Sequence, residues 1–414
     1  MKTADKTAFE RLIHAEPILI GCRKMGEIFP DFPKNRILHS GPELRWEDMK
    51  GPHRKGIVGA ALFEGLAGSE AEAESMIQSG AIEVKAANDA CSGAPGAGIT
   101  SHSMAVLEVR EKNSGIVAIA PPIEGEQGGG LGGWGVYNAD VDANLRRIRD
   151  VYAPVFTRAL ETIGGINVAE LFGAGLSLGD EEHTRQYATD KVFFAKLTMA
   201  VLESDCSERE KLEFLRWAAA NSEKRFVHHI GCASAVASLK AAAGVPGSSL
   251  VTAMCGNGHE FGIKLSGTGE TWFTAPAPTF HGKYWKPEYT DADSSPWLGD
   301  SSNVEAWGFG GMAAAASPVL LANRGETLWD GLAQCAEMAK ICAGANPRNV
   351  IPQLPGRLAP AGILAEKAQA EEIAPKLHGG ILSRVSGGQI GVGYARVPMA
   401  CFAKAMAALA AARP

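Results

Sequence analysis

The 414-residue sequence lacks three features: long hydrophobic runs, paired cysteines and blocks of positive charge. Charged or turn residues interrupt every apolar stretch before it reaches the roughly 18 residues that a membrane helix needs. Residues 1–17 hold no apolar core of signal-peptide length, so we expect a cytoplasmic protein. The net charge is −6 and no Lys/Arg block opposes it, which argues against nucleic acid as a partner.

The eight cysteines are scattered, and none stands in a C-x-x-C pair. This pattern argues against a zinc ribbon or a redox dithiol, and we expect small, reduced, buried side chains. Glycine, by contrast, is abundant, and its 49 residues cluster, which indicates loops and close backbone approaches. The length exceeds one ordinary core, so we expect two or three domains.

The first 120 residues alternate short β-like runs with helical stretches. "GIVGAALF" at 56–63 predicts a buried strand, and "SEAEAESMIQSG" at 69–80 predicts a capped helix that ends at glycine. A hairpin is expected around 113–115, where Asn-Ser-Gly separates two apolar runs. This mixture is typical of an α/β fold.

Helical periodicity dominates the next stretch, which includes a capping box at Ser207 and Glu210. A β-rich polar core and a glycine-rich loop or strand leading into a terminal helix follow in the rest of the chain. The sequence therefore predicts an α/β (α+β) protein with two α/β domains and a helical domain inserted between them. The expected boundaries are 1–138, 139–222 and 223–414.

"EGEQGGGLGGWGVYN" at 124–138 is the most glycine-rich stretch. We interpret it as a lid or linker, because no P-loop lysine follows at the required spacing. If the protein uses phosphate, residues 128–133 and the glycine-spaced turn at 93–103 are the candidate anion nests.

"GDEEHTR" at 179–185 crowds carboxylates, an imidazole and a guanidinium together. One interpretation is a solvated helix start capped by Asp180. The other is a functional site on a helix, where Asp180 and His183, or Glu181 and Arg185, share a face. Arg185 would then clamp a carboxylate or phosphate, while His183 and a carboxylate handle protons.

A second polar cluster follows the Gly256–Asn257–Gly258 turn in the block 246–278. Asn257 is a candidate oxyanion donor and Glu260 a candidate general base. Ser248 or Ser249 is expected to cap a short helix. The alternative is a tight turn with surface polar residues.

Further candidates lie in two other polar turns. "WLGDSSNVEAWGFGG" at 297–311 offers Asp300, Ser301 and Glu305. In the first domain the glycine-spaced turn precedes Ser101, His102 and Ser103, and Cys91 is a potential nucleophile without a partner histidine fixed by sequence.

Four blocks carry a family resemblance: "GDEEHTR", "SSLVTAMCGNGHEFGIKLSGTGETWFTAP", "GDSSNVEAWGFGG" and "GQIGVGYARVPM". From about residue 36 onward the chain resembles the family of the oxamate carbamoyltransferase subunit AllG, also called YlbE. The block at 38–67, which contains Glu64, fits the N-terminal block of that family. The resemblance implies two unusual α/β domains around a helical one. It also implies one subunit of an assembly that moves a carbamoyl group between oxalurate and phosphate in allantoin breakdown.

The chain departs from the family pattern at two places. It reads "AANDACSGAPG" where relatives tend to be histidine-rich, and Ser101-His102-Ser103-Met104 where they commonly read Ser-Pro-Ser-Met. There is also apparent extra sequence at 371–387. These departures suggest a changed substrate.

Two sets of site candidates result. The expected catalytic residues are Glu260, Asn257, His183, Asp180 and Glu181. The expected substrate-binding residues are Arg185, Ser101, His102, Ser103, Glu64, Asp300 and Ser301.

The leading hypothesis is carbamoyl transfer to phosphate, acting on a small anionic ureido, carbamoyl or cyclic amide substrate. The alternatives are hydrolysis of a C–N bond and a non-catalytic subunit of a carbamoyltransferase complex. We expect a homo-oligomer or a hetero-complex with other pathway subunits. No cofactor is expected; a divalent metal stays an alternative, because Asp180, Glu181 and His183 are competent ligands.

Overall fold

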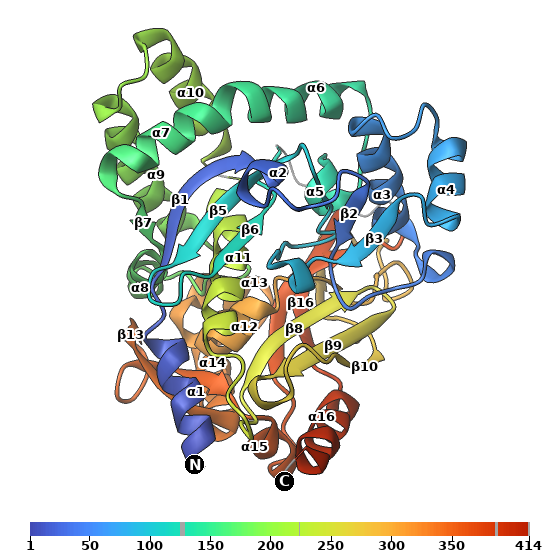
Figure 1. Ribbon diagram of the computed structural model, residues 1–414. Helices are drawn as coiled ribbons and strands as arrows, with labels where there is room; N and C mark the ends of the chain where they lie inside the picture. Colours follow the sequence, from blue (N-terminus) through green and yellow to red (C-terminus); the bar gives the residue numbers. More distant parts are fainter. Residues whose placement is uncertain (125–128, 223, 386–387, 413–414) are drawn as a thin grey trace.

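The computed structural model describes residues 1–124, 129–222, 224–385 and 388–412 (Figure 1). Helices and small sheets alternate along this part of the chain, which confirms the α/β class. The proposed division into three domains stays a prediction. The helices are α1 (Thr3–Ile13), α2 (Met25–Ile28), α3 (Gly51–Phe63), α4 (Glu70–Gln78), α5 (Leu131–Trp134), α6 (Ala139–Arg147), α7 (Ala153–Ile163), α8 (Val168–Ser177), α9 (Tyr187–Glu203), α10 (Glu208–Asn221), α11 (Phe226–Ala241), α12 (Asn303–Trp307), α13 (Pro318–Asn323), α14 (Leu328–Ile341), α15 (Ala365–Ala370) and α16 (Met399–Ala411).

The strands form several small sheets, mostly antiparallel. In the first half of the chain, one sheet has the order β6-β5-β1-β7 and another β3-β2-β4, in which β2 and β3 are parallel. Their strands are β1 (Pro17–Lys24), β2 (Arg36–His39), β3 (Glu83–Ala86), β4 (Thr100–Ser101), β5 (Ala105–Glu111), β6 (Val117–Ala120) and β7 (Ile166–Asn167).

The second half contributes sheets of order β10-β9-β8-β12 and β11-β16-β15, and the pair β13-β14. These strands are β8 (Val251–Asn257), β9 (Glu260–Leu265), β10 (Phe273–Pro276), β11 (His281–Tyr284), β12 (Leu298–Gly299), β13 (Cys342–Val350), β14 (Leu358–Ile363), β15 (Lys376–Leu382) and β16 (Gln389–Arg396).

Helix α11 runs through the middle of the molecule and packs on β1, β5 and β6 on one side and on β8 and α12 on another. Its small residues permit this close approach: a Cβ on Gly231 would lie 2.4 Å from the Phe172 ring. Ser234 and Ser238 satisfy their buried hydroxyls by donating to carbonyls one turn back. The histidines near its N-terminus are thereby held in the centre of the fold.

The strand expected at 56–63 is wrong, because this run lies in α3. A short apolar run does not distinguish a buried strand from a buried helix. Its glycines serve helix packing: a Cβ on Gly56 would lie 2.5 Å from Ile99, and a Cβ on Gly59 would lie 2.5 Å from Tyr137.

Other local predictions are confirmed. The β5–β6 hairpin turns at Gly115, whose φ is +74°, and Ser207 and Glu210 form the capping box of α10. Helices α6 and α7 form one rod across the top of Figure 1, joined by a π-helical turn at 148–152. That turn directly precedes Pro154, which lacks the N–H that a regular α-helix would use.

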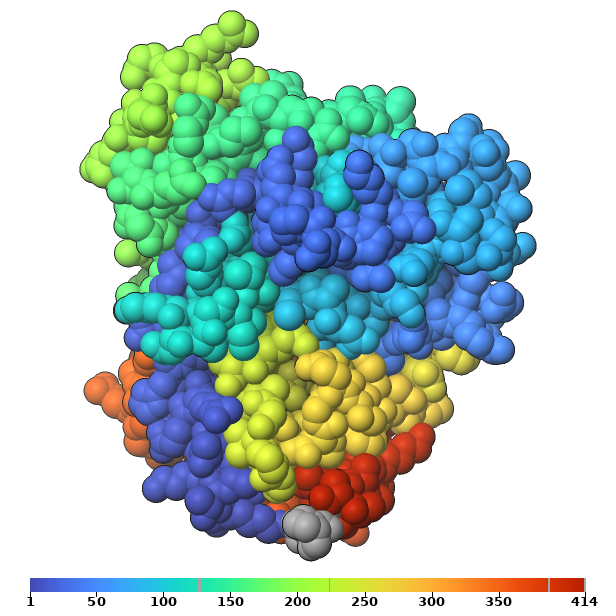
Figure 2. Space-filling model, viewed as in Figure 1, coloured from blue at the N-terminus to red at the C-terminus, as the bar shows by residue number. Residues whose placement is uncertain are grey.

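Helix α1 packs on β13 and β14, which come from the last fifth of the chain, and Figure 2 shows this blue segment beside the orange one. Its buried Asp5 accepts hydrogen bonds from Ser249 N at 2.6 Å and from the Ser248 hydroxyl at 3.0 Å. The helix expected to be capped by Ser248 or Ser249 is wrong, because these residues lie in a turn before β8. Among the described helices, none combines the length and apolar character needed to cross a bilayer.

Candidate functional site

The segment 179–186 is a buried loop between α8 and α9, so the helix expected at 180–185 is wrong. Glu182 has a φ of +72°, in the left-handed region. The carboxylate of Glu181 accepts hydrogen bonds from the backbone of His183 at 3.3 Å and of Arg185 at 2.9 Å, and also from the N–H of Thr184. Because the Glu181 side chain binds these N–H groups, they make no helical hydrogen bonds.

The charges of this loop are not solvated. Asp180 and Glu182 are fully buried and both accept hydrogen bonds from Thr189, in the first turn of α9. Asp180 also pairs with Arg185, which donates a second hydrogen bond to Gly179 O at 3.0 Å. Burial raises the pKa of Asp180 and of Glu182, although these hydrogen bonds oppose it.

His183 pairs with Glu305 of α12. Its Nδ1 lies 2.7 and 2.8 Å from the two carboxylate oxygens, and both side chains are buried. The backbone N–H groups of Gly311 and His378 also donate to Glu305, at 3.1 and 3.0 Å. Gly310 is required here, because its φ is +56° and a Cβ would lie 2.2 Å from Glu305 Oε1. The carboxylate thus fixes the imidazole and leaves Nε2 as its basic atom.

A second histidine–carboxylate pair lies behind the first. The Gln334 side-chain atom that faces Gly311 O must be the amide nitrogen, because a carbonyl only accepts. The same nitrogen lies 3.0 Å from His378 Nε2 and therefore donates to it. His378 therefore carries its proton on Nδ1, which lies 3.4 Å from Glu181 Oε2. Burial alone would raise the pKa of Glu181, but His378, His183 and the backbone N–H groups outweigh it and hold that pKa at about 2. Burial, followed by the charge of Arg324, lowers the pKa of His378 to about 4.

Arg225, just before α11, ties this loop to the central helix. It donates to the Gln186 side-chain oxygen at 3.2 Å and to His183 O at 2.6 Å. The Gln186 amide nitrogen donates to His183 O at 2.6 Å and lies 3.1 Å from His228 Nδ1. The His228 ring stacks on the His183 ring with centroids 5.4 Å apart. Arg225 and His228 therefore hold fixed positions beside His183.

His183, Arg225, His228 and His229 line one cavity, together with Lys224. Its volume is about 70 Å³, which leaves room for several water-sized groups, because a single water needs about 10–15 Å³. Ser301 and Gln389 add two polar side chains, and most of the remaining wall is apolar side chains and glycines, among them Trp134, Phe280, Trp297, Gly96, Gly379 and Gly380. Such a site suits a small planar anion.

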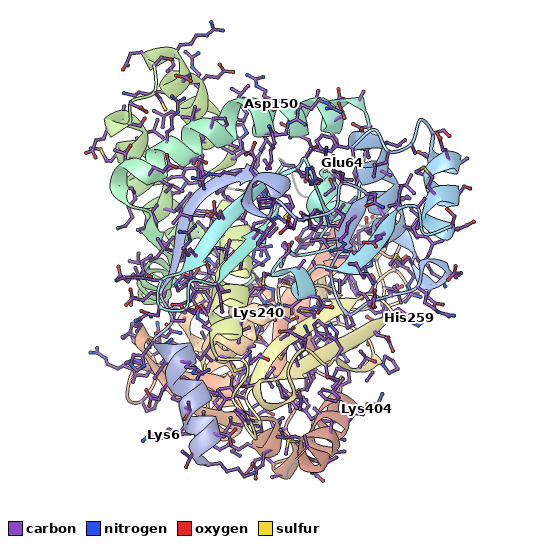
Figure 3. All side chains as sticks on the ribbon, viewed as in Figure 1. Lys6, Glu64, Asp150, Lys240, His259 and Lys404 are labelled. Atoms are coloured by element: carbon purple, nitrogen blue, oxygen red, sulfur yellow. The ribbon has the colours of Figure 1, made fainter. Side chains whose placement is uncertain are left out.

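The structure does not bring the β8–β9 candidates into this cavity. Glu260 is half-buried at the start of β9 and accepts a hydrogen bond from Thr274 at 3.2 Å. Asn257 uses its oxygen on the backbone of His259 and Glu260 and its nitrogen on Pro42 O. The chain makes a tight turn here, with His259 exposed at the hairpin tip (Figure 3) and Asn257 buried. The catalytic roles of Glu260 and Asn257 stay predictions.

The N-terminal candidates meet one another, away from the cavity. Glu64 accepts hydrogen bonds from the Ser101 hydroxyl and from Ser103 N, both at 2.6 Å. His102 lies on Phe32, whose carbonyl is 3.1 Å from its Nδ1. None of these side chains is among those that line the cavity within the described residues.

Of the candidates in the turn 297–311, Ser301 lines the cavity and Asp300 lies buried behind it. Asp300 accepts a hydrogen bond from Gly41 N at 2.6 Å, and its other oxygen has no partner among the described residues. Burial raises the pKa of Asp300 to about 7.

The glycine-rich segment lies partly outside the described residues, at 125–128. In the described part, Glu124 accepts hydrogen bonds from Leu131 N at 2.7 Å and Gly132 N at 2.6 Å. These two N–H groups of the proposed nest are therefore already occupied by a carboxylate. Burial raises the pKa of Glu124 to about 7.

The proposed metal ligands face different partners, since Asp180 turns to Arg185 and Glu181 to backbone N–H groups. Across the described ranges, no group of three or more His, Cys, Asp or Glu side chains is arranged to hold a metal ion.

Sequence reasoning did not single out Arg225, His228, His229 or His378 as site residues. The stretch "KRFVHHIGC" offered a signal, namely two adjacent histidines and two basic residues before an Ala-rich helix. His378 lies in β15, within the stretch 371–387 that the resemblance set apart as apparent extra sequence.

The fold and site define a class: a mixed α/β protein whose small cavity joins a histidine–carboxylate pair to basic side chains. A family model for the oxamate carbamoyltransferase subunit AllG matches residues 82–301. The chain is 32% identical over 411 residues to the protein of that name from Escherichia coli (strain K12), covering 98% of this chain and 97% of that protein. The chain therefore belongs to the family of the oxamate carbamoyltransferase subunit AllG.

Two other relatives are similar over nearly the whole chain. The uncharacterized protein YahG from Escherichia coli (strain K12) is 33% identical over 410 residues, covering 97% of this chain and 84% of YahG. A crystal structure of a conserved protein of unknown function from Enterococcus faecalis V583 has a TM-score of 0.93 at 32% identity, covering 99% of this chain and 97% of that one.

Proposed function

We propose that this chain is a catalytic subunit that transfers a carbamoyl group between a small anionic ureido substrate and phosphate. The observation that carries the proposal is the His183–Glu305 pair at a small cavity that Arg225 and Lys224 also line. In this proposal His183 moves protons, and Arg225 and Lys224 hold negative charge.

In this proposal His183 Nε2 takes a proton from phosphate as a phosphate oxygen attacks the carbamoyl carbon. The C–N bond of the substrate then breaks, and His183 returns the proton to the departing amide nitrogen. The products are carbamoyl phosphate and the free amide, so charge and protons balance. Glu305 keeps the imidazole in the Nδ1–H tautomer and stabilises its charged form during the step.

Family membership supports this choice of reaction, because one relative is named an oxamate carbamoyltransferase subunit. That name also supports assembly of this chain with other subunits. The apolar rings in the wall leave little room for water beside a bound substrate, which favours transfer over the hydrolysis that the same base would otherwise promote.

The test is turnover of oxalurate, small cyclic ureides and imides by the purified chain, each with and without phosphate. Strictly phosphate-dependent loss of substrate supports transfer, and equal rates without phosphate show a hydrolase. Turnover only after addition of pathway subunits, unaffected by His183→Gln, shows a non-catalytic role.

A further inference from the structure

Two histidines of the cavity take no part in the proton transfer described above. His228 and His229 are neighbours on α11, their ring centroids are 6.1 Å apart, and both line the cavity beside His183. Each has its Nδ1 bound to the protein, and the hydrogen bonds of both rings among the described residues are made through Nδ1. What each Nε2 offers a ligand depends on which nitrogen carries the proton.

The proton of His228 is located by the orientation of Gln186. The Gln186 oxygen accepts from Arg225 and its nitrogen donates to His183 O, so the amide cannot be reversed. That nitrogen, 3.1 Å from His228 Nδ1, can only donate to it. The neutral His228 ring therefore carries its proton on Nε2 and offers the cavity a donor.

His229 has the opposite arrangement. Its Nδ1 lies 2.7 Å from Pro121 O, a carbonyl that can only accept. Nδ1 therefore carries the proton, and Nε2 offers the cavity a lone pair. Burial lowers the pKa of His229 to about 4 and the pKa of His228 well below its usual value, so both rings stay neutral at pH 7.

A neutral donor and a neutral acceptor side by side match a primary amide, whose oxygen accepts and whose NH₂ donates. We propose that His228 and His229 recognise the –CO–NH₂ end of the ligand, with His228 Nε2–H on the oxygen and His229 Nε2 on the NH₂ group. The Arg225 guanidinium, on the same wall, then takes the anionic end. The assignment rests on the proposed function only in the choice of a small anion as ligand.

Oxamate and pyruvate test this pair by binding alone. The two anions differ only in NH₂ against CH₃, and pyruvate would leave the His229 lone pair without a donor. Calorimetric titration should show oxamate binding tighter by about 10²-fold or more, because a site built to bond an N–H group rejects an isostere that lacks it.

The variants give different patterns for the two rings. His229→Leu should bring the two affinities within about tenfold of each other, and His229→Gln, which keeps an acceptor, should restore part of the preference. His228→Leu should weaken both ligands and preserve their ratio, because both carry the oxygen. His14→Leu, at an exposed histidine, is the matched control.

The tautomers provide a readout that needs no ligand. Two-bond ¹H–¹⁵N spectra of histidine-labelled protein at pH 7, assigned with the same variants, should show His228 protonated on Nε2 and His229 on Nδ1. Reversed tautomers, or equal affinity of the wild type for oxamate and pyruvate, overturn the pair and leave the proposed function standing. Selective oxamate binding without carbamoyl turnover supports the roles of His228 and His229 and contradicts the proposed function. A protein that binds neither anion contradicts both.

Discussion

The loop 179–186 and the tip of the β8–β9 hairpin look alike in sequence, because each places charged or amide side chains beside a glycine. In the structure they differ in what surrounds them. The loop is closed over by α11, α12 and β15, and His183 meets Glu305 across 122 residues of chain. The hairpin tip satisfies its own polar groups and leaves His259 exposed. Burial against distant segments, rather than local composition, distinguishes the region fit for proton transfer.

The largest expected difference between the two regions is in kcat. Glu305→Gln should lower kcat by about 10²–10⁴-fold, because an amide can donate to Nδ1 and so place the proton on the wrong nitrogen of His183. Glu260→Gln should leave kcat within about twofold of the wild type, because Glu260 does not line the cavity. Steady-state kinetics with circular dichroism of both variants checks this. Equal losses would return Glu260 to the role of base.

The two arginines should separate binding from stability. Arg225→Leu should raise KM for an anionic substrate by about 30–1000-fold, the 2–4 kcal/mol typical of a lost charge partner, and Arg225→Lys should recover only part. Arg185→Leu should leave KM unchanged and lower the free energy of unfolding, because it leaves the buried Asp180 without its cation. Unchanged stability with a raised KM for Arg185→Leu would place that arginine on the substrate.

The loop and Asp300, which directly follows the strand beside the hairpin, should respond to pH with opposite signs. Glu181 has a pKa of about 2 against an ordinary 4.5, so its contribution is present above pH 4.5 and lost as pH falls towards 2. Asp300, where β12 pairs with β8, has a pKa of about 7 against an ordinary 3.8. Its contribution is present below pH 3.8 and lost as pH rises through 7. Between pH 5 and 8 the wild type should lose roughly 2–3 kcal/mol of stability that Asp300→Asn does not lose.

Urea unfolding of wild type and Asp300→Asn from pH 5 to 8, and of wild type and Glu181→Gln from pH 5 down to 2, measures the slopes. Asp31→Asn, at an exposed carboxylate, is the control and should follow the wild type. Parallel curves for wild type and Asp300→Asn would contradict the raised pKa.

The smallest expected effect is on stability, from a substitution at the tip of the β8–β9 hairpin. Asn257→Ala removes a side chain that accepts from two backbone N–H groups and donates to Pro42 O. It should lower the free energy of unfolding by about 1–3 kcal/mol and leave kcat unchanged. A loss of activity on the order of 10²-fold without loss of stability would instead support an oxyanion role.

Local chemistry made much of the fold predictable. The Ser207–Glu210 box, the 113–115 turn and the terminal strand and helix depend on near neighbours in sequence, and all are confirmed. The strand predicted at 56–63 was wrong because the small residues of this run pack against partners elsewhere in the chain, which its own sequence does not reveal.

The site was predictable only in part. The 179–185 motif and the turn containing Ser301 and Glu305 stood out by composition, but their pairing depends on tertiary structure. His228 and His229 resemble ordinary core residues of an Ala-rich helix, and only the orientation of Gln186 and the carbonyl of Pro121 gives them a role.

The docking of α1 on the C-terminal strands has a consequence for synthesis. Arg348 donates to Ala15 O across 333 residues, an interval that a ribosome takes roughly 15–70 s to translate. During that time the apolar face of α1, including Phe9 and Leu12, lacks the β13 and β14 surface that covers part of it, although α11 is already made. The first helix to be made is therefore among the last to settle, and this part of the fold closes only after the ribosome has delivered most of the chain.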